Sequence, residues 1–148
     1  MSSNITKVAV IGTGVIGAGW IIRALAHNRQ VTAFDKDIKL KKKLIKEIKR
    51  TWPYVKKLFN KKKLNLNKLK FVDSIKEAVQ DVDFIQECVT ENYNLKTKLM
   101  HNIGKYAKPN AIISSSSSGL LPSRIYAKCK NADRKTTRLN SSHSEISY

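Results

Sequence analysis

The sequence has few acidic residues, little cysteine and few aromatic side chains. Its 148 residues contain 11 Asp and Glu against 29 Lys and Arg, which gives a formal net charge of +18 at pH 7. The two cysteines, Cys88 and Cys129, lie far apart, and this excludes a disulfide-rich scaffold or a zinc site with paired cysteines. Such sparse cysteine is typical of a reduced, cytoplasmic protein. The length suits one domain and excludes two complete ones.

Continuous apolar stretches are also scarce. The uncharged run from Val8 to Ile22 has the length of the apolar part of a secretory signal. Glycines at positions 12, 14, 17 and 19 interrupt this run, and glycine at that density disfavours a continuous apolar helix. We therefore interpret the run as part of a folded domain, and we expect no membrane partner.

Most of the positive charge is confined to one segment. Between Lys36 and Lys70 there are 15 Lys or Arg and two acidic residues, Asp37 and Glu47. The segment lacks the interleaved Arg and aromatic side chains of nucleic-acid interfaces, and AT-rich coding that favours Lys, Asn and Ile explains it sufficiently. We do not expect a nucleic-acid partner. A basic module for nucleic acid or another polyanion stays open as a competing function, as does attraction of an acidic substrate such as a coenzyme A thioester.

The amino-terminal residues have the pattern of a nucleotide-binding turn. A short β-branched run, Lys7 to Ile11, predicts a buried central strand, and residues 18–26 have helical spacing. The glycines between them would allow a tight turn, close approach to a pyrophosphate, and close packing of helix on strand. The N–H groups at the start of the helix would face the phosphates. The predicted cofactor-binding residues of this turn are Gly12, Thr13, Gly14, Val15, Ile16 and Gly17.

An acidic residue at the end of the next predicted strand completes the pattern. Residues 30–34 read as that strand, and Asp35 follows it, 23 residues beyond Gly12. A carboxylate at this point accepts hydrogen bonds from the ribose 2′-hydroxyl of NAD and repels the 2′-phosphate of NADP. NAD is therefore the predicted cofactor, although the neighbouring cation Lys36 could make NADP tolerable.

The rest of the chain alternates between predicted strands and helices. A lysine-clad amphipathic helix is predicted from Ile38 to about Arg50, and Pro53 should break or kink it. Further strands are predicted at 70–72, 83–89 and 111–113, with helices between them. This alternation predicts an α/β fold of the Rossmann type, a doubly wound parallel sheet whose ligands bind at the carboxyl ends of the strands.

Two polar loops follow strands of that sheet. Thr90-Glu91-Asn92 comes after the strand at 83–89, and Ser114 to Ser118 with Gly119 come at the end of the strand at 111–113. Five serines and a glycine alone would read as a flexible linker. A linker is not expected between a buried strand and the apolar Leu120-Leu121-Pro122, so we favour a functional loop.

Four motifs, together with Trp20 and Gly119, point to one family. The motifs are Val10 to Gly17, Trp52-Pro53, Ile85 to Val89 and Ser115 to Ser123. Over about residues 7–134 the chain resembles the NAD-binding domain of the L-3-hydroxyacyl-CoA dehydrogenase family. The similarity is strongest to the branch with L-carnitine 3-dehydrogenase and the lambda-crystallin type L-gulonate dehydrogenases, and Trp20 and Gly119 favour the carnitine type.

The resemblance implies an activity and further site residues. It implies an oxidoreductase that oxidises the 3-hydroxyl of a small hydroxy acid with NAD, as L-carnitine 3-dehydrogenase does, or alternatively an L-3-hydroxyacyl-CoA dehydrogenase of fatty acid metabolism. Glu91 and Lys96 match positions that contact the cofactor, and Ser118 matches the serine that hydrogen-bonds the substrate's 3-oxygen. The family's base is a histidine in a His-Pro-Phe-Asn-Pro-like motif. The parent enzyme is expected to be a homodimer, and no metal is expected.

The carboxyl-terminal end departs from the family pattern. Counting on from Ser118 puts the histidine near Leu139, and His143 has neither Pro nor Phe beside it. Residues 135–148 are polar, Ser-rich and similar to a translated adaptor. We therefore expect residues 1–134 to be a Rossmann domain without its last strand and helical C-terminal domain, followed by an unmatched tail at 135–148, and inactive. Resequencing the source DNA across codons 130–140 tests this, because an unbroken natural gene would contradict it.

Overall fold

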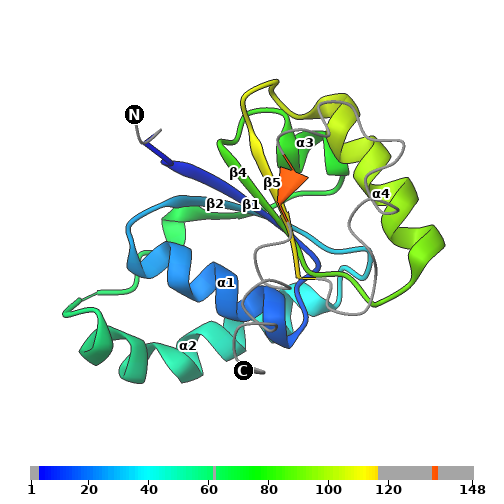
Figure 1. Cartoon of the computed structure of the whole chain (residues 1–148). Coiled ribbons are helices and arrows are strands. Elements are labelled where there is room, and N and C mark those ends of the chain that lie inside the picture. Colours follow the sequence, from blue (N-terminus) through cyan, green and yellow to red (C-terminus); the bar gives the residue numbers. More distant parts are fainter. Residues whose placement is uncertain (1–3, 62, 117–134, 137–148) are drawn as a thin grey trace, which may run out of the picture.

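Strands and helices alternate along the chain as the sequence pattern predicts. The computed structural model describes residues 4–61, 63–116 and 135–136 (Figure 1). Its strands are β1 (Lys7–Ile11), β2 (Gln30–Phe34), β3 (Leu69–Phe71), β4 (Phe84–Glu87), β5 (Ile112–Ser115) and β6 (Lys135–Thr136). Its helices are α1 (Val15–Ala26), α2 (Leu40–Leu58), α3 (Ile75–Val79) and α4 (Tyr93–Tyr106), with a short 3-10 helix at Leu66–Lys68.

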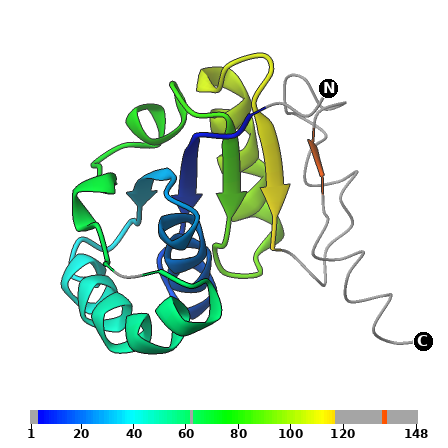
Figure 2. The same ribbon diagram turned by 90° about the vertical axis from the view of Figure 1, so that its left-hand side faces the viewer.

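The strands form one parallel sheet in the order β3-β2-β1-β4-β5-β6. The chain builds outward from β1 to β3, returns to place β4 beside β1, and continues to the opposite edge. Figure 2 shows β1, β4 and β5 side by side with their arrows pointing the same way. This is the Rossmann-type, doubly wound sheet that the sequence predicts. The reversal between β1 and β4 creates a crevice at the carboxyl ends of the strands, where ligands bind in such sheets.

Helices cover both faces of the sheet and create two cores. α1 and α2 lie on one face, and α3 and α4 lie on the other (Figure 1). In β1, Val8 and Val10 pack on the α1 side, whereas Ala9 and Ile11 pack on the α4 side. Burial on both faces explains why β1 is an unbroken apolar run in the sequence.

Pro53 does not interrupt the helix in which it lies. α2 is a single helix of 19 residues that continues past Pro53 to Leu58, so the predicted break at Pro53 is wrong. Leu44, Ile48 and Trp52 are buried at helical spacing along one face of α2. A proline inside a helix costs about 3 kcal/mol, and burial of this face, at about 2 kcal/mol for each large side chain, offsets that cost.

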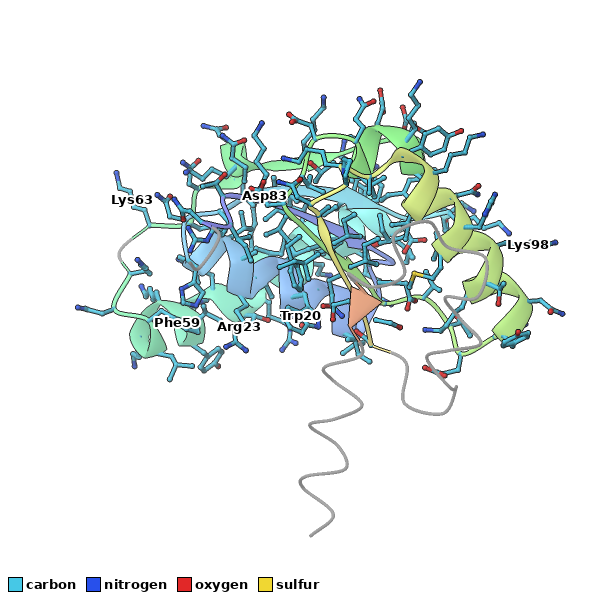
Figure 3. The ribbon with its side chains drawn as sticks, turned by 45° about the horizontal axis from the view of Figure 1, so that its top comes forward. Trp20, Arg23, Phe59, Lys63, Asp83 and Lys98 are labelled. Atoms are coloured by element: carbon cyan, nitrogen blue, oxygen red, sulfur yellow. The ribbon has the colours of Figure 1, made fainter. Side chains whose placement is uncertain are left out.

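The lysines of α2 lie on its solvent face. Lys41, Lys42, Lys43, Lys46 and Lys49 are all exposed, which confirms the predicted lysine-clad amphipathic helix. Beyond α2, Lys63 also projects away from the body of the domain (Figure 3). Within the described ranges, no helix combines the length and the apolar character that a membrane span requires.

The sheet continues past β5 by one short strand, where the sequence pattern predicts none. The backbone of β6 pairs in parallel with Ile113 and Ser114 of β5. The edge of β5 presents unpaired N–H and C=O groups, which any extended segment can pair with, whatever its side chains. The sequence analysis predicts that the last strand is missing, and the two-residue pairing of β6 corrects that prediction. The predicted domain boundary at residue 134 stays a prediction.

Asp83, directly before β4, ties the start of β1 to β4. Its carboxylate accepts hydrogen bonds from the backbone N–H groups of Thr6 and Lys7, both at 3.0 Å, and from the Lys108 ammonium, also at 3.0 Å. Partial burial raises the pKa of this carboxyl, but the hydrogen bonds from Lys7, Thr6 and Lys108 outweigh burial and hold the pKa well below its usual range. Because the folded pKa is depressed, the ionised group stabilises the fold above its unfolded pKa of about 4, and this contribution is lost as the pH falls.

We expect Asp83→Asn to lower the free energy of unfolding by about 2 kcal/mol at neutral pH, because hydrogen bonds to an ionised acceptor are lost. The deficit should shrink as the pH falls from about 5 toward about 2, since the wild-type carboxylate then loses its advantage. Urea unfolding of both proteins across this range measures the effect. Asp81→Asn is the control, because Asp81 pairs with Lys7 at 2.8 Å but is largely exposed. Equal losses in the two variants would contradict the role of Asp83.

Candidate functional site

Two glycines between β1 and α1, and a third in the first turn of α1, each meet a different spatial demand. Gly12 has a φ of 93°, and a Cβ there would lie 2.8 Å from the carbonyl oxygen of Cys88. At Gly17 a Cβ would lie 1.8 Å from the carbonyl oxygen of Gly12. At Gly14 a Cβ would meet nothing within 4 Å, so the space over its backbone is open. These are the three uses predicted from the sequence: a tight turn, close helix packing and room for a phosphate.

The open space lies at the amino end of α1. The helix begins at Val15 with Gly14 as its N-cap, and the first N–H groups of a helix have no partner within it. Val15 is 91% exposed and Ile16 is 58% exposed, so their side chains do not pack into the core and do not bury these N–H groups. Unpaired N–H groups and the positive end of the helix dipole favour an anion here. Gly14 and the start of α1 thus border a space that suits a phosphate.

Asp35, directly after β2, is joined to the glycine turn. Its Oδ2 accepts hydrogen bonds from the Thr13 backbone N–H at 2.7 Å and from the Thr13 hydroxyl at 3.0 Å. Its Oδ1 accepts one from the backbone N–H of Asp37 at 3.0 Å. A carboxylate has about four acceptor positions, so about one is left for a ribose hydroxyl. Asp35 therefore also holds the turn in place. The sequence pattern does not predict this function, and the one feature that could have indicated it is the position of Thr13 between two glycines.

A cleft of about 520 Å³ runs from the glycine turn to α4. Phe34, Ile75, Leu95 and Leu99 supply apolar walls, and Asp35 supplies an acceptor. The cleft also touches the loop that follows β4, so it occupies the crevice where the strand order reverses. Lys36 and Lys98 are further charged groups in its lining, and Lys98 projects outward from α4 (Figure 3). An apolar cleft with an anion site and a hydroxyl acceptor has the chemistry of a dinucleotide site.

Glu91 and Lys96 lie together at the carboxyl end of β4. The Lys96 ammonium is 3.7 Å from Glu91 Oε1, and the side chains are 0% and 44% exposed respectively. Lys96 also pairs with Glu87, the last residue of β4, at 2.9 Å. The structure thus brings the two predicted residues together, but it buries Lys96 completely. Glu87 is the member that the sequence reasoning misses; a charged residue at the end of an apolar strand is its signal.

Cys88 lies beside the turn without the properties of a nucleophile. Burial is the main cause that raises the pKa of its thiol to about 11, so the group stays protonated at neutral pH. Its Sγ lies 3.2 Å from the Ser116 hydroxyl, which also accepts a hydrogen bond from the Gln86 side chain at 2.8 Å. In the part of the chain that the structure describes, Cys88 is a free cysteine, and no group of His, Cys, Asp and Glu is arranged to hold a metal.

The predicted substrate residue Ser118 lies outside the described residues, as do Leu139 and His143. Of the described histidines, His27 follows α1 and His101 lies on α4, and both are exposed. Neither lines the 520 Å³ cleft. The described part of the site therefore holds the features of a nucleotide-binding region but no imidazole that could act as a base.

A model of the family described as 3-hydroxyacyl-CoA dehydrogenase, NAD binding domain, matches residues 7–138. The L-carnitine dehydrogenase of Oceanobacillus iheyensis is 44% identical over 128 residues, which are 86% of this chain and 42% of that protein. The L-carnitine dehydrogenase of Staphylococcus epidermidis is 40% identical over 128 residues, which are 86% of this chain and 40% of that protein. The chain thus spans about two fifths of the length of these relatives.

Solved structures show the same fold. The 3-hydroxybutyryl-CoA dehydrogenase of Escherichia coli has a TM-score of 0.78 at 26% identity, and the match covers 90% of this chain and 29% of that one. The (S)-3-hydroxybutyryl-CoA dehydrogenase of Ralstonia eutropha has a TM-score of 0.79 at 24% identity, with 89% and 48% covered. The predicted Rossmann-type fold is confirmed by both.

A Cβ would have room at Gly14 but not at Gly17. Substitutions at these two positions therefore test cofactor binding and folding separately. We expect Gly14→Ala to fold with a loss below about 1 kcal/mol and to bind NADH roughly tenfold more weakly, a loss of about 1.4 kcal/mol. The added methyl group would occupy the space that a pyrophosphate requires. Gly17→Ala should instead unfold the domain or lower its melting temperature strongly, because its Cβ collides with backbone. Thermal unfolding and titration of NADH fluorescence measure the two effects.

Gly19→Ala is the matched control on the same helix. A Cβ at Gly19 also meets nothing within 4 Å, but this residue lies within α1, away from its N-cap. The substitution should stabilise the helix by about 0.5–1 kcal/mol and leave NADH affinity unchanged. If Gly14→Ala bound NADH as tightly as Gly19→Ala does, the phosphate site would not lie over Gly14.

Proposed function

The chain belongs to the 3-hydroxyacyl-CoA dehydrogenase NAD-binding domain family, and we propose that it is the cofactor-binding part of a carnitine dehydrogenase-like oxidoreductase. NAD is the cofactor of this family, and the residues present fit it. The observation that supports the proposal is the contact between Asp35 and the glycine turn, because Gly14 and Asp35, which we propose bind the pyrophosphate and the ribose, line the same cleft.

The proposed substrate is a small 3-hydroxy acid of the carnitine type. The relatives named L-carnitine dehydrogenase are 40% and 44% identical to this chain, whereas the solved 3-hydroxybutyryl-CoA dehydrogenases are 26% and 24% identical. These identities favour carnitine over an acyl-CoA substrate. The chain covers about two fifths of the carnitine relatives, so the activity and the substrate of the whole protein are part of this proposal.

We propose that residues on the two sides of the glycine turn bind different parts of the cofactor. When bound, NAD supplies an acceptor for the hydride that leaves the alcohol carbon of the substrate. Gly14 and the start of α1 would hold the pyrophosphate, and Asp35 would hold the adenosine ribose. We propose that Glu91 and Lys96 serve the other half of the cofactor, and that Ser118 hydrogen-bonds the substrate's 3-oxygen.

We propose that this chain binds NAD without turning over a substrate. No described histidine lines the cleft, and the histidine motif of the family is absent from the sequence. A mixture of the chain, NAD and either L-carnitine or 3-hydroxybutyryl-CoA should therefore form no NADH, measured by its absorbance. Steady formation of NADH with either alcohol would contradict this part of the proposal.

A cytoplasmic location and a homodimeric parent enzyme are also proposed. The location is supported by the free thiol of Cys88. The dimer is supported by the family resemblance alone.

We expect Asp35→Ala to weaken NADH binding at least about tenfold, since both the ribose acceptor and the brace on Thr13 are lost. Wild type should bind NADH more tightly than NADPH because the carboxylate repels the 2′-phosphate, and Asp35→Ala should remove this preference. Asp37→Ala is the control, an exposed acid two residues away that lies outside the cleft lining. Fluorescence titrations with both cofactors measure all three proteins.

The same titrations separate this function from the competing basic module. The exposed lysines of α2 are the observation that favours polyanion binding. DNA binding that weakens steeply with salt, without any response of NADH fluorescence to the chain, would support the basic module and overturn the dehydrogenase proposal.

A further inference from the structure

One cation in the cleft lies next to the proposed ribose acceptor. Lys36 directly follows Asp35 and is exposed, and both residues line the 520 Å³ cleft. Within the part of the chain that the structure describes, Lys36 forms no ion pair. Its ammonium can therefore bind an anion in the cleft without first losing a partner among the described side chains.

The neighbouring acid is largely engaged with the chain itself. Asp35 accepts two hydrogen bonds from Thr13, at 2.7 and 3.0 Å, and one from the backbone N–H of Asp37 at 3.0 Å. Each donor places a partial positive charge against the carboxylate, so less of its negative charge acts on a ligand. About one acceptor position remains, which is enough for one ribose hydroxyl. Asp35 therefore repels a 2′-phosphate less than a carboxylate without these donors would.

Acidic and basic residues alternate in the segment after β2, but only one of each borders the cleft. Asp37 and Lys39 lie outside the cleft lining, and Asp37 accepts a hydrogen bond from the Lys39 backbone N–H at 3.0 Å. Asp35 and Lys36 are the pair that a ligand in the cleft would meet. A phosphate monoester carries about 1.5 to 2 negative charges at pH 7, so it gains far more from a cation than a hydroxyl group does.

The other cation of the cleft belongs to a different wall. Lys98 lies on α4, which follows β4, and β1 separates β4 from β2 in the sheet. In Figure 3 its side chain projects outward from α4. Of the two lysines in the lining, only Lys36 is adjacent in sequence to Asp35.

We infer that Lys36 is a specificity-determining residue for the cofactor: its ammonium binds the 2′-phosphate of NADP, so that the cleft accepts NADP as a second cofactor beside NAD. This inference rests on the proposed function, in which a dinucleotide occupies the cleft with its adenosine ribose at Asp35. NAD has a hydroxyl where NADP has the phosphate, so Lys36 contributes little to the binding of NAD.

Two substitutions at Lys36 and two pairs of ligands test the inference. Lys36→Met removes the charge, whereas Lys36→Arg keeps it and offers a fork of N–H groups that suits a phosphate. NADH and NADPH are titrated by fluorescence at about 0.15 M salt, which screens distant exposed charges. The second pair, 5′-AMP and adenosine 2′,5′-bisphosphate, differs by the 2′-phosphate alone and is measured by competition with NADH.

Wild type should bind NADPH no more than about tenfold more weakly than NADH. We expect Lys36→Met to weaken the binding of NADPH and of the bisphosphate about tenfold, the effect of losing one charge-assisted hydrogen bond. Its affinities for NADH and 5′-AMP should stay within about twofold of wild type. Lys36→Arg should bind NADPH at least as tightly as wild type does. Because Lys36 is exposed, both variants should keep the melting temperature of wild type.

Lys98→Met and Lys39→Met are the matched controls. The first removes the same charge from the other wall of the cleft, and the second removes it three residues along the chain, outside the lining. Neither should change the ratio of the NADPH and NADH affinities by more than about twofold.

Four results would overturn the inference and leave the proposed function standing. A wild-type preference for NADH above about tenfold would mean that the cleft does not accept NADP as a second cofactor. Unchanged NADPH affinity in Lys36→Met would mean that this lysine is only solvated. Equal losses for NADH and NADPH would place its action away from the 2′-phosphate. An equal selective loss in Lys98→Met would mean that the combined charge of several lysines attracts the phosphate. Wild type without any NADH response would instead overturn the proposed function, and this inference with it.

Discussion

The contact between Gly17 and the carbonyl of Gly12 brings α1 directly onto the end of β1. No Cβ fits between them, and a Cβ at Gly12 would meet the backbone of Cys88. No side chain therefore separates the turn from α1 or from the end of β4 at these two positions. This close packing directs the first N–H groups of α1 into the crevice where the strand order reverses. The rest of the candidate site lies around that end of α1.

Two acids at strand ends hold the turn and the neighbouring loop in place. Asp35 accepts hydrogen bonds from Thr13, and Glu87 accepts them from Val89 and Lys96. Asp35 thereby joins the end of β2 to the turn after β1. Glu87 joins the end of β4 to the loop that follows it and to α4. The two differ in burial: Asp35 keeps an exposed part that can accept a ligand, whereas Glu87 is fully buried and needs a cation beside it. Asp35 therefore holds the turn and also lines the cleft, whereas Glu87 is closed off from solvent.

The large positive charge plays little part in this arrangement. The lysines of α2 extend from the face opposite its buried residues Leu44, Ile48 and Trp52. Lys96 is the exception among the described lysines, because it is buried and paired. The number of lysines in a sequence thus says less about function than the burial of one of them.

Strands β1 to β5, the spatial demands on the three glycines and the place of Asp35 could be predicted from the sequence alone. They follow from local periodicity and from spacing along the chain, which hold in any fold of this type. The same local rules fail at Pro53, where burial of Leu44, Ile48 and Trp52 outweighs the preference of proline. They also miss the Thr13 brace on Asp35 and the group formed by Glu87, Lys96 and Ser115. These contacts join residues 9 to 28 positions apart, and only the packing of strands and helices determines which polar groups share one buried space.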